Sequence, residues 1–172
     1  HDYALLRIIS TLDGTSLPSA FPYLPFDTRE KIAFSGDRVL LAGYPAEFAI
    51  QGSRGTTLYP TSVFTRVGEL MTFAERSVDL ISLGGAVLAQ SGSSGGAVVN
   101  TWGKLVGIIS TTSAGATTAE RELRAVTLFY VDRDLQAQTG SILSQFLERD
   151  LAEHAMTFMI SEAPSLSAKL LE

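Results

Sequence analysis

Short apolar runs, separated by turn residues, follow one another along most of the chain. Residues 37–45, with the sequence DRVLLAGYP, form a strand candidate that ends at a Gly-Tyr-Pro turn. The run YALLRII at residues 3–9 also has the length of a strand. Closely spaced short strands of this kind are typical of an all-β sandwich or barrel. The further strand candidates are residues 56–59, 62–67, 69–73, 79–83, 86–89, 97–100, 105–110 and 125–131.

The hydrophobic period changes near Thr139. Leu143, Leu147, Leu151 and Phe158 recur at helical spacing, so that they share one face of a helix. The pattern predicts a helix from about residue 140 to residue 160, followed by a tail.

Composition and charge exclude several classes of protein. The chain has 172 residues, enough for one domain or for part of a larger one, with 45% hydrophobic and 18% charged residues. Its net charge of -5 provides no basic footprint for nucleic acid. No apolar stretch is long enough to span a bilayer. Because the chain has no cysteine, it has neither a disulfide framework nor a thiolate metal site.

A serine inside a glycine-rich turn is the main candidate for chemistry. Residues 90–100 have the sequence QSGSSGGAVVN, and Ser94 lies at the centre of G-S-S-G-G. A nucleophilic serine needs an exposed hydroxyl and nearby N–H donors for the oxyanion. Gly92 lets the backbone adopt angles at which its own N–H and that of Ser94 converge. The alternative interpretation is a glycine-rich linker or turn whose serines only make local hydrogen bonds.

The same five residues also satisfy the G-x-S-x-G elbow of α/β-hydrolases. The required order of Ser94, then Asp132 or Asp134, then His154 is present. The elbow, however, requires a helix directly after the serine, whereas residues 95–110 predict two short strands around a turn. We therefore favour a β context for Ser94, and a helix beginning at about residue 95 would restore the hydrolase interpretation.

Three blocks of the sequence resemble the chymotrypsin-fold, trypsin-like serine peptidases, especially the cysteine-free HtrA-like group. DYALLRI at residues 2–8 is similar to the strand that presents the family's catalytic aspartate. FSGDRVLLAGYP at residues 34–45 is similar to the strand that opens the second barrel. SGSSGGAVVNTWGKLVGIIS at residues 91–110 is similar to the segment around the nucleophile. The blocks occur in the family's order.

The resemblance implies an all-β fold with a six-stranded antiparallel β-barrel, the second barrel of the chymotrypsin fold, and a C-terminal α-helix. The first barrel would be largely missing from this chain, which opens in mid-strand. The expected organisation is the last strand of the N-terminal barrel at 1–9, a connector at 10–36, the C-terminal barrel at 37–136, and a helix and tail at 137–172.

The resemblance also implies roles for individual residues. Ser94 would be the nucleophile, and Asp2 the carboxylate that orients and stabilises the base. The backbone N–H groups of Gly92 and Ser94 would form the oxyanion hole. Asp79 is a less favoured acid, because it lies only fifteen residues before Ser94, on a strand of the second barrel.

Four further residues would contact substrate if the resemblance holds. Ser110 and Thr111 would line the primary pocket, and their strand would pair with the substrate backbone. Leu88 and Gln90 would lie near the pocket floor, where a leucine favours an apolar or small substrate side chain.

The general base, a histidine in this family, is the catalytic group that the chain does not supply in the family's order. The family's histidine precedes the aspartate by tens of residues, whereas this chain has only His1 and His154. Neighbouring side chains on a strand point to opposite faces, so Asp2 does not easily orient His1. His154 lies in the predicted helix with Asp150 one turn before it, which suits a packed or interface histidine.

These observations predict a serine endopeptidase that forms an acyl-enzyme on Ser94 without a metal or organic cofactor. The isolated chain, lacking the base, should be inactive. The alternative is a catalytically dead binding module of the same fold. The expected partners are a polypeptide substrate and an N-terminal barrel that bears the catalytic histidine, or self-association through the face that barrel would cover. Family analogy alone favours an extracytoplasmic location, periplasmic or secreted.

Overall fold

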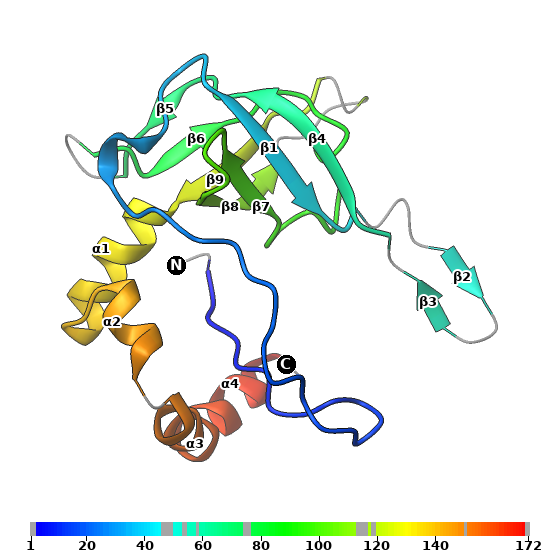
Figure 1. Ribbon diagram of the computed structural model, residues 1–172, viewed down its shortest axis with the longest axis vertical. Helices are drawn as coiled ribbons and strands as arrows, with labels where there is room; N and C mark the ends of the chain where they lie inside the picture. Colours follow the sequence, from blue (N-terminus) through cyan, green and yellow to red (C-terminus); the bar gives the residue numbers. More distant parts are fainter. Residues whose placement is uncertain are drawn as a thin grey trace. The chain divides into compact units, whose positions relative to one another are not determined.

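The chain forms two compact units in the computed structural model (Figure 1). The first unit contains residues 1–3 and 22–134, and the second contains residues 4–21 and 135–172. The structure describes residues 3–45, 50–52, 55–57, 59–73, 77–112, 117, 120–149 and 151–170.

The first unit is built on one antiparallel sheet of seven strands. Their order across the sheet is β4-β1-β7-β8-β9-β6-β5, and Figure 1 shows β1 and β4 side by side. This unit also contains a separate pair, β2 (Ile50–Gly52) and β3 (Gly55–Thr57), and a short 3-10 helix, η1 (Glu30–Ile32). The strands of the sheet are β1 (Arg38–Gly43), β4 (Thr61–Arg66), β5 (Leu70–Met71), β6 (Leu80–Ser82), β7 (Ala97–Asn100), β8 (Leu105–Thr112) and β9 (Leu123–Thr127).

The core of the first unit follows from the alternation of apolar and polar residues along its strands. In β1, Val39 and Leu41 are buried while Arg38 is exposed, as expected for a strand with one face on the core. Each fully buried aliphatic side chain stabilises the fold by about 1.5–3 kcal/mol relative to an exposed one. The largest fully buried apolar side chains are Leu41, Ile81, Leu83, Leu88, Ile109 and Leu123.

The sheet is curled so far that its two edge strands are consecutive along the chain. Three residues, 67–69, connect β4 to β5, and three residues span at most about 10 Å. The Val67 N–H donates to the Asp37 carbonyl beside β1 at 2.9 Å, and the Gly68 N–H donates to the Ser82 carbonyl of β6 at 2.8 Å. Within the described residues β4 and β5 do not pair with each other, so the sheet is an incompletely closed barrel.

The predicted antiparallel β fold with C-terminal helices is confirmed, but the strand count of six differs from the seven observed. The count of six comes from the family resemblance, whereas the hydrophobic pattern predicts separate strands on the two sides of the link at 67–69. The predicted strand at 86–89 is wrong, because the Ala89 N–H donates to the Ala86 carbonyl at 2.7 Å and closes a tight turn. Residues 3–9 carry no strand either, and their assignment to a first barrel stays a prediction.

A helix that the strand pattern did not predict follows β9 directly. Residues 128–131 continue an apolar, β-prone run, yet α1 (Leu128–Thr139) begins there. The Thr127 hydroxyl accepts the Tyr130 N–H at 3.1 Å, and this cap stabilises the first turn. Gly140, with φ of 73°, ends the helix in the left-handed conformation that glycine favours.

The single helix predicted for residues 140–160 is divided. The second unit contains α2 (Leu143–Glu148), α3 (Leu151–Ser161) and α4 (Ala163–Leu170). Arg149 has extended backbone angles, which interrupt the helix after α2. Pro164 cannot donate to the preceding turn, so it lies in the first turn of α4. Among the described residues, no helix has the length and apolarity needed to cross a membrane.

The buried carboxylate of Asp79 connects the segment between β5 and β6 to α1. The side chain is fully buried and accepts hydrogen bonds from the Phe73 N–H at 2.7 Å and the Ser77 hydroxyl at 2.9 Å. The Arg133 guanidinium of α1 donates to it at 2.7 Å. Asp79 therefore holds the β5–β6 connection against α1, which gives this residue a structural role.

Replacement of Asp79 with alanine should lower the free energy of unfolding by about 3 kcal/mol, because the Phe73 N–H and Arg133 would lose a buried charged acceptor. Urea denaturation measures this change. The matched control is Glu69→Ala, which removes an exposed carboxylate and should change stability by no more than about 0.5 kcal/mol. Equal effects of the two substitutions would contradict the assignment.

Candidate active site

Ser94 lies in a tight turn that leads into β7. Gly92 and Gly95 have φ of 87° and 85°, angles that residues with a side chain rarely adopt. The Gly95 N–H donates to the Ile109 carbonyl at 2.7 Å, and the Ile109 N–H donates to the Gly96 carbonyl at 2.8 Å. These two bonds hold the turn against β8.

The backbone of Gly96 packs where no side chain fits. A Cβ atom added at Gly96 would lie 2.8 Å from the Ala42 carbonyl oxygen and 2.9 Å from the Ser93 carbonyl oxygen. It would also lie 3.0 Å from the Ile109 side chain. Position 96 therefore requires glycine, and its close contact with β1 and β8 sets the position of the Ser94 turn.

The Ser94 side chain is exposed, and its hydroxyl donates to the Ser110 carbonyl at 2.8 Å. Across the residues that the structure describes, neither the Gly92 N–H nor the Ser94 N–H donates to a protein acceptor. The neighbouring Ser93 is completely buried. The turn thus presents one hydroxyl and two available backbone donors, the groups that an acyl-transfer site requires.

A groove of about 390 Å³ opens beside Ser94. The groove is lined by the Ser94 turn, by Tyr44 just after β1 and by Pro60 just before β4. Among the residues that the structure describes, the lining contains no charged side chain, and this part of the groove suits uncharged and mainly apolar groups. The sequence pattern did not predict that Tyr44 and Pro60 lie beside Ser94, since Tyr44 is fifty residues away along the chain. The turn signal in AGYP at residues 42–45 was the available clue.

The structure places the Ser94 hydroxyl against the Ser110 carbonyl, with Gly92 in the same turn, and the roles assigned to these residues stay predictions. Leu88 is fully buried in the core, and Gln90 is buried with no partner for its Oε1 in the described part of the chain. Neither residue lines the groove, and their role in substrate selection stays a prediction.

Several predicted residues lie outside what the structure describes. Asp2 and His1 are not among the described residues, and the side chains of His154 and Thr111 are not described. The chain just after Asp2 is held by Tyr3, whose hydroxyl donates to Asp134 at 2.6 Å.

The elbow of an α/β-hydrolase is excluded by the element that follows Ser94. The strand β7 begins at Ala97 and pairs with β1 and β8, whereas the elbow would require a helix there.

Comparisons with known proteins place the sequence in a family. The model of the trypsin-like peptidase domain matches residues 1–108, which include Ser94. The solved structure of a mutant of human heparin binding protein matches with a TM-score of 0.47 and 18% identity. That match covers 73% of this chain and 54% of the other, so the chain spans little more than half of that protein's length. The search of curated proteins finds no match.

Replacement of Gly96 with alanine should destabilise the fold by about 1–3 kcal/mol, because the added methyl group would press on the Ala42 and Ser93 carbonyls. Thermal or urea unfolding measures the loss. The matched control is Gly43→Ala, whose Cβ would lie no closer than 3.6 Å to its neighbours and should be tolerated. A Gly96→Ala chain as stable as the control would show that this contact does not determine the turn.

Proposed function

The chain belongs to the trypsin-like peptidase family, and we propose that it is the nucleophile-bearing part of a serine endopeptidase. The observation that carries the proposal is the Ser94 turn. Its exposed hydroxyl and the two available N–H donors of Gly92 and Ser94 lie beside a groove whose described lining residues are uncharged. Family membership supports peptide-bond hydrolysis as the reaction.

In the proposed reaction, the Ser94 oxygen attacks the carbonyl carbon of the substrate while a histidine takes the hydroxyl proton. The carbonyl oxygen becomes an oxyanion and accepts hydrogen bonds from the Gly92 and Ser94 N–H groups. The tetrahedral intermediate then expels the amine, which receives the proton from histidine, and leaves an acyl-enzyme. Water hydrolyses this ester by the same steps and restores Ser94.

The edge of β8 near Ser94 supports binding of an extended substrate. The strand β7 pairs with β8 no further than Ile108, and the Ser110 carbonyl lies beyond that point. This carbonyl accepts the Ser94 hydroxyl, so the hydroxyl must leave it before the proton can pass to a base. We propose that a substrate strand pairs with β8 here while Ser94 turns toward the base.

The proposed base lies outside the described side chains, which include no histidine. By the family pattern it belongs to a first barrel, together with Asp2 as the orienting carboxylate. The chain alone would then hold the nucleophile and the oxyanion donors without the group that activates the nucleophile. Loss of the base from such a site removes most of the catalysis and leaves a residual rate.

A non-enzymatic binding module of the same fold is the second candidate. One observation favours it, since the Ser94 hydroxyl already has an acceptor in the Ser110 carbonyl, as a purely structural serine would. The two candidates differ in whether Ser94 reacts when a base is provided.

Imidazole in solution should accelerate the reaction of Ser94 with a fluorophosphonate probe, because a small diffusible base can take the proton that the chain cannot accept. Intact-mass spectrometry of the 172-residue chain follows the labelling, and peptide mapping locates the adduct. Without imidazole the labelling should be slow.

The variants Ser94→Ala and Ser91→Ala complete this experiment. Ser94→Ala should abolish the adduct, whereas Ser91→Ala removes another exposed serine of the same turn and should retain it. Absence of labelling at any imidazole concentration would favour the binding module. Rapid labelling without imidazole would instead show that the chain contains its own base.

A further inference from the structure

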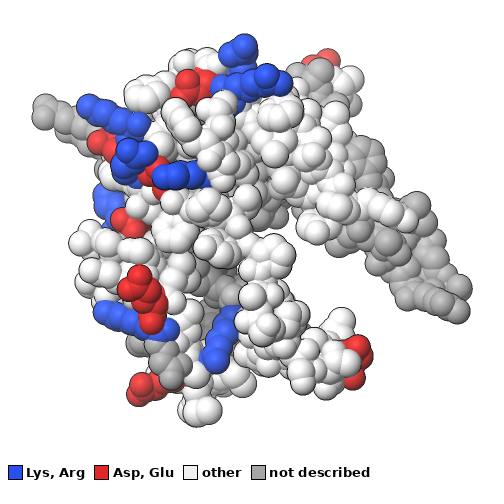
Figure 2. Space-filling view, in the orientation of Figure 1, with Lys and Arg blue, Asp and Glu red and all other residues white. Residues whose placement is uncertain are grey.

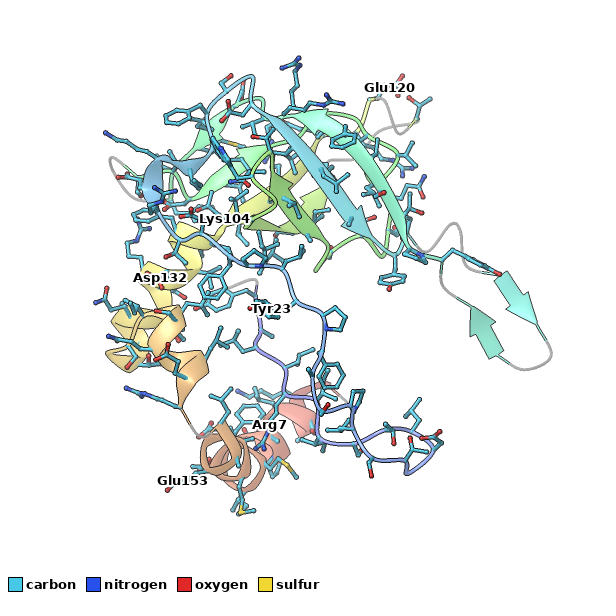
Figure 3. The ribbon with its side chains drawn as sticks, viewed as in Figure 1. Arg7, Tyr23, Lys104, Glu120, Asp132 and Glu153 are labelled. Carbon is cyan, nitrogen blue, oxygen red and sulfur yellow. The ribbon has the colours of Figure 1, made fainter. Side chains whose placement is uncertain are left out.

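A second pocket, of about 380 Å³, lies between η1 and the turn that joins β7 to β8. Its described lining residues all differ from those of the groove beside Ser94. Figure 2 shows basic side chains gathered over the region of η1, with acidic ones among them, and Figure 3 labels Lys104 at the pocket. The residues that define its chemistry are Asp27, Arg29, Lys31, Phe34, Trp102 and Lys104.

The backbone around this pocket is fixed by hydrogen bonds. The Asp27 N–H donates to the Leu105 carbonyl at 2.9 Å, and the Leu105 N–H donates to the Pro25 carbonyl at 2.8 Å. The buried Asn100 accepts the N–H groups of Trp102 and Lys104 on one side-chain oxygen, at 3.1 and 3.0 Å. The two segments that form the walls are therefore held in place before any ligand binds.

The pocket carries an excess of positive charge. The buried Asp27 carboxylate accepts hydrogen bonds from Arg29 at 2.9 and 2.7 Å and from Lys104 at 3.4 Å. The Arg29 guanidinium holds the pKa of the Asp27 carboxyl well below its usual range. Among the described lining residues, one negative charge therefore lies with three cations, those of Arg29, Lys31 and Lys104. In the part of the chain that the structure describes, Lys31 has no ion-pair or hydrogen-bond partner.

Two aromatic rings lie exposed beside these cations. Trp102 is 70% exposed and Phe34 is 53% exposed, although both are large apolar side chains that burial would stabilise. The pocket thus combines cationic groups, which attract an anion, with flat faces on which a planar ring can stack.

We propose that this pocket binds a compact organic anion in which a carboxylate or phosphate group adjoins an aromatic ring. The cations of Lys31 and Lys104 bind the anionic group, and Trp102 and Phe34 contact the ring. The ligand is compact because the net charge of -5 repels an extended polyanion, whereas salt screens the distant charges from a small one. The proposal is independent of whether Ser94 is catalytic.

Fluorescence tests this proposal directly, because Trp102 is the sole tryptophan of the chain. Titration with N-acetylphenylalanine or with phenyl phosphate should change the emission saturably, and the two titrations together show which anionic group is preferred. The neutral N-acetylphenylalanine amide isolates the contribution of charge, and inorganic phosphate isolates that of the ring. The amide and inorganic phosphate should each bind more weakly than the aromatic anions, and added salt should weaken binding of the aromatic anions.

Two substitutions, each of which removes one positive charge, distinguish binding in the pocket from binding elsewhere on the surface. Lys31→Gln should weaken binding by about tenfold, the effect of losing one charge-assisted contact. Lys169→Gln, in α4 and outside the pocket, should leave the affinity unchanged. The proposal is overturned if neither aromatic anion gives a saturable signal. It also fails if the amide binds as tightly as the acid, or if Lys31→Gln binds like the unsubstituted chain.

Discussion

The close packing of Gly96 between two strands is the constraint on which the Ser94 site depends. A Cβ atom at this position would clash with the Ala42 carbonyl of β1 and press on the Ile109 side chain of β8, and the Gly96 carbonyl accepts the Ile109 N–H. Because position 96 has no side chain, the turn can lie close to both strands, and Gly92 and Gly95 adopt positive φ angles within it. In this packed turn the Ser94 hydroxyl is exposed, and the Gly92 and Ser94 N–H groups have no protein acceptor among the described residues.

The sequence allowed the prediction of features that depend on local pattern and on chain order. The alternation in β1 and the glycines around Ser94 predicted a strand and a turn, and both occur. The context of Ser94 was also predictable, because two glycines followed by AVVN favour a strand over a helix. The pattern failed at residues 128–131, where it predicted a strand. These residues begin a helix whose first turn is capped by the Thr127 hydroxyl.

Features that depend on distant segments could not be predicted from the pattern. Tyr44 and Pro60 line the groove beside Ser94 because β1 pairs with both β7 and β4 in the sheet. The basic pocket likewise needs Asp27 and Lys104, which are seventy-seven positions apart, to lie together. The backbone hydrogen bonds of Leu105 with Asp27 and Pro25 bring them there. The segments that form these two pockets are ordinary turns and connectors, and nothing in their sequences indicates that they lie together.

The structure of the chain after phosphonylation of Ser94 tests the central claim most directly. The account predicts that the phosphonyl oxygen of the adduct lies within about 2.7–3.1 Å of both the Gly92 and the Ser94 backbone nitrogens. The Ser94 side chain should also have left the Ser110 carbonyl. An adduct whose oxygen points to solvent, with neither N–H donating to it, would contradict the assignment of this turn as an oxyanion site.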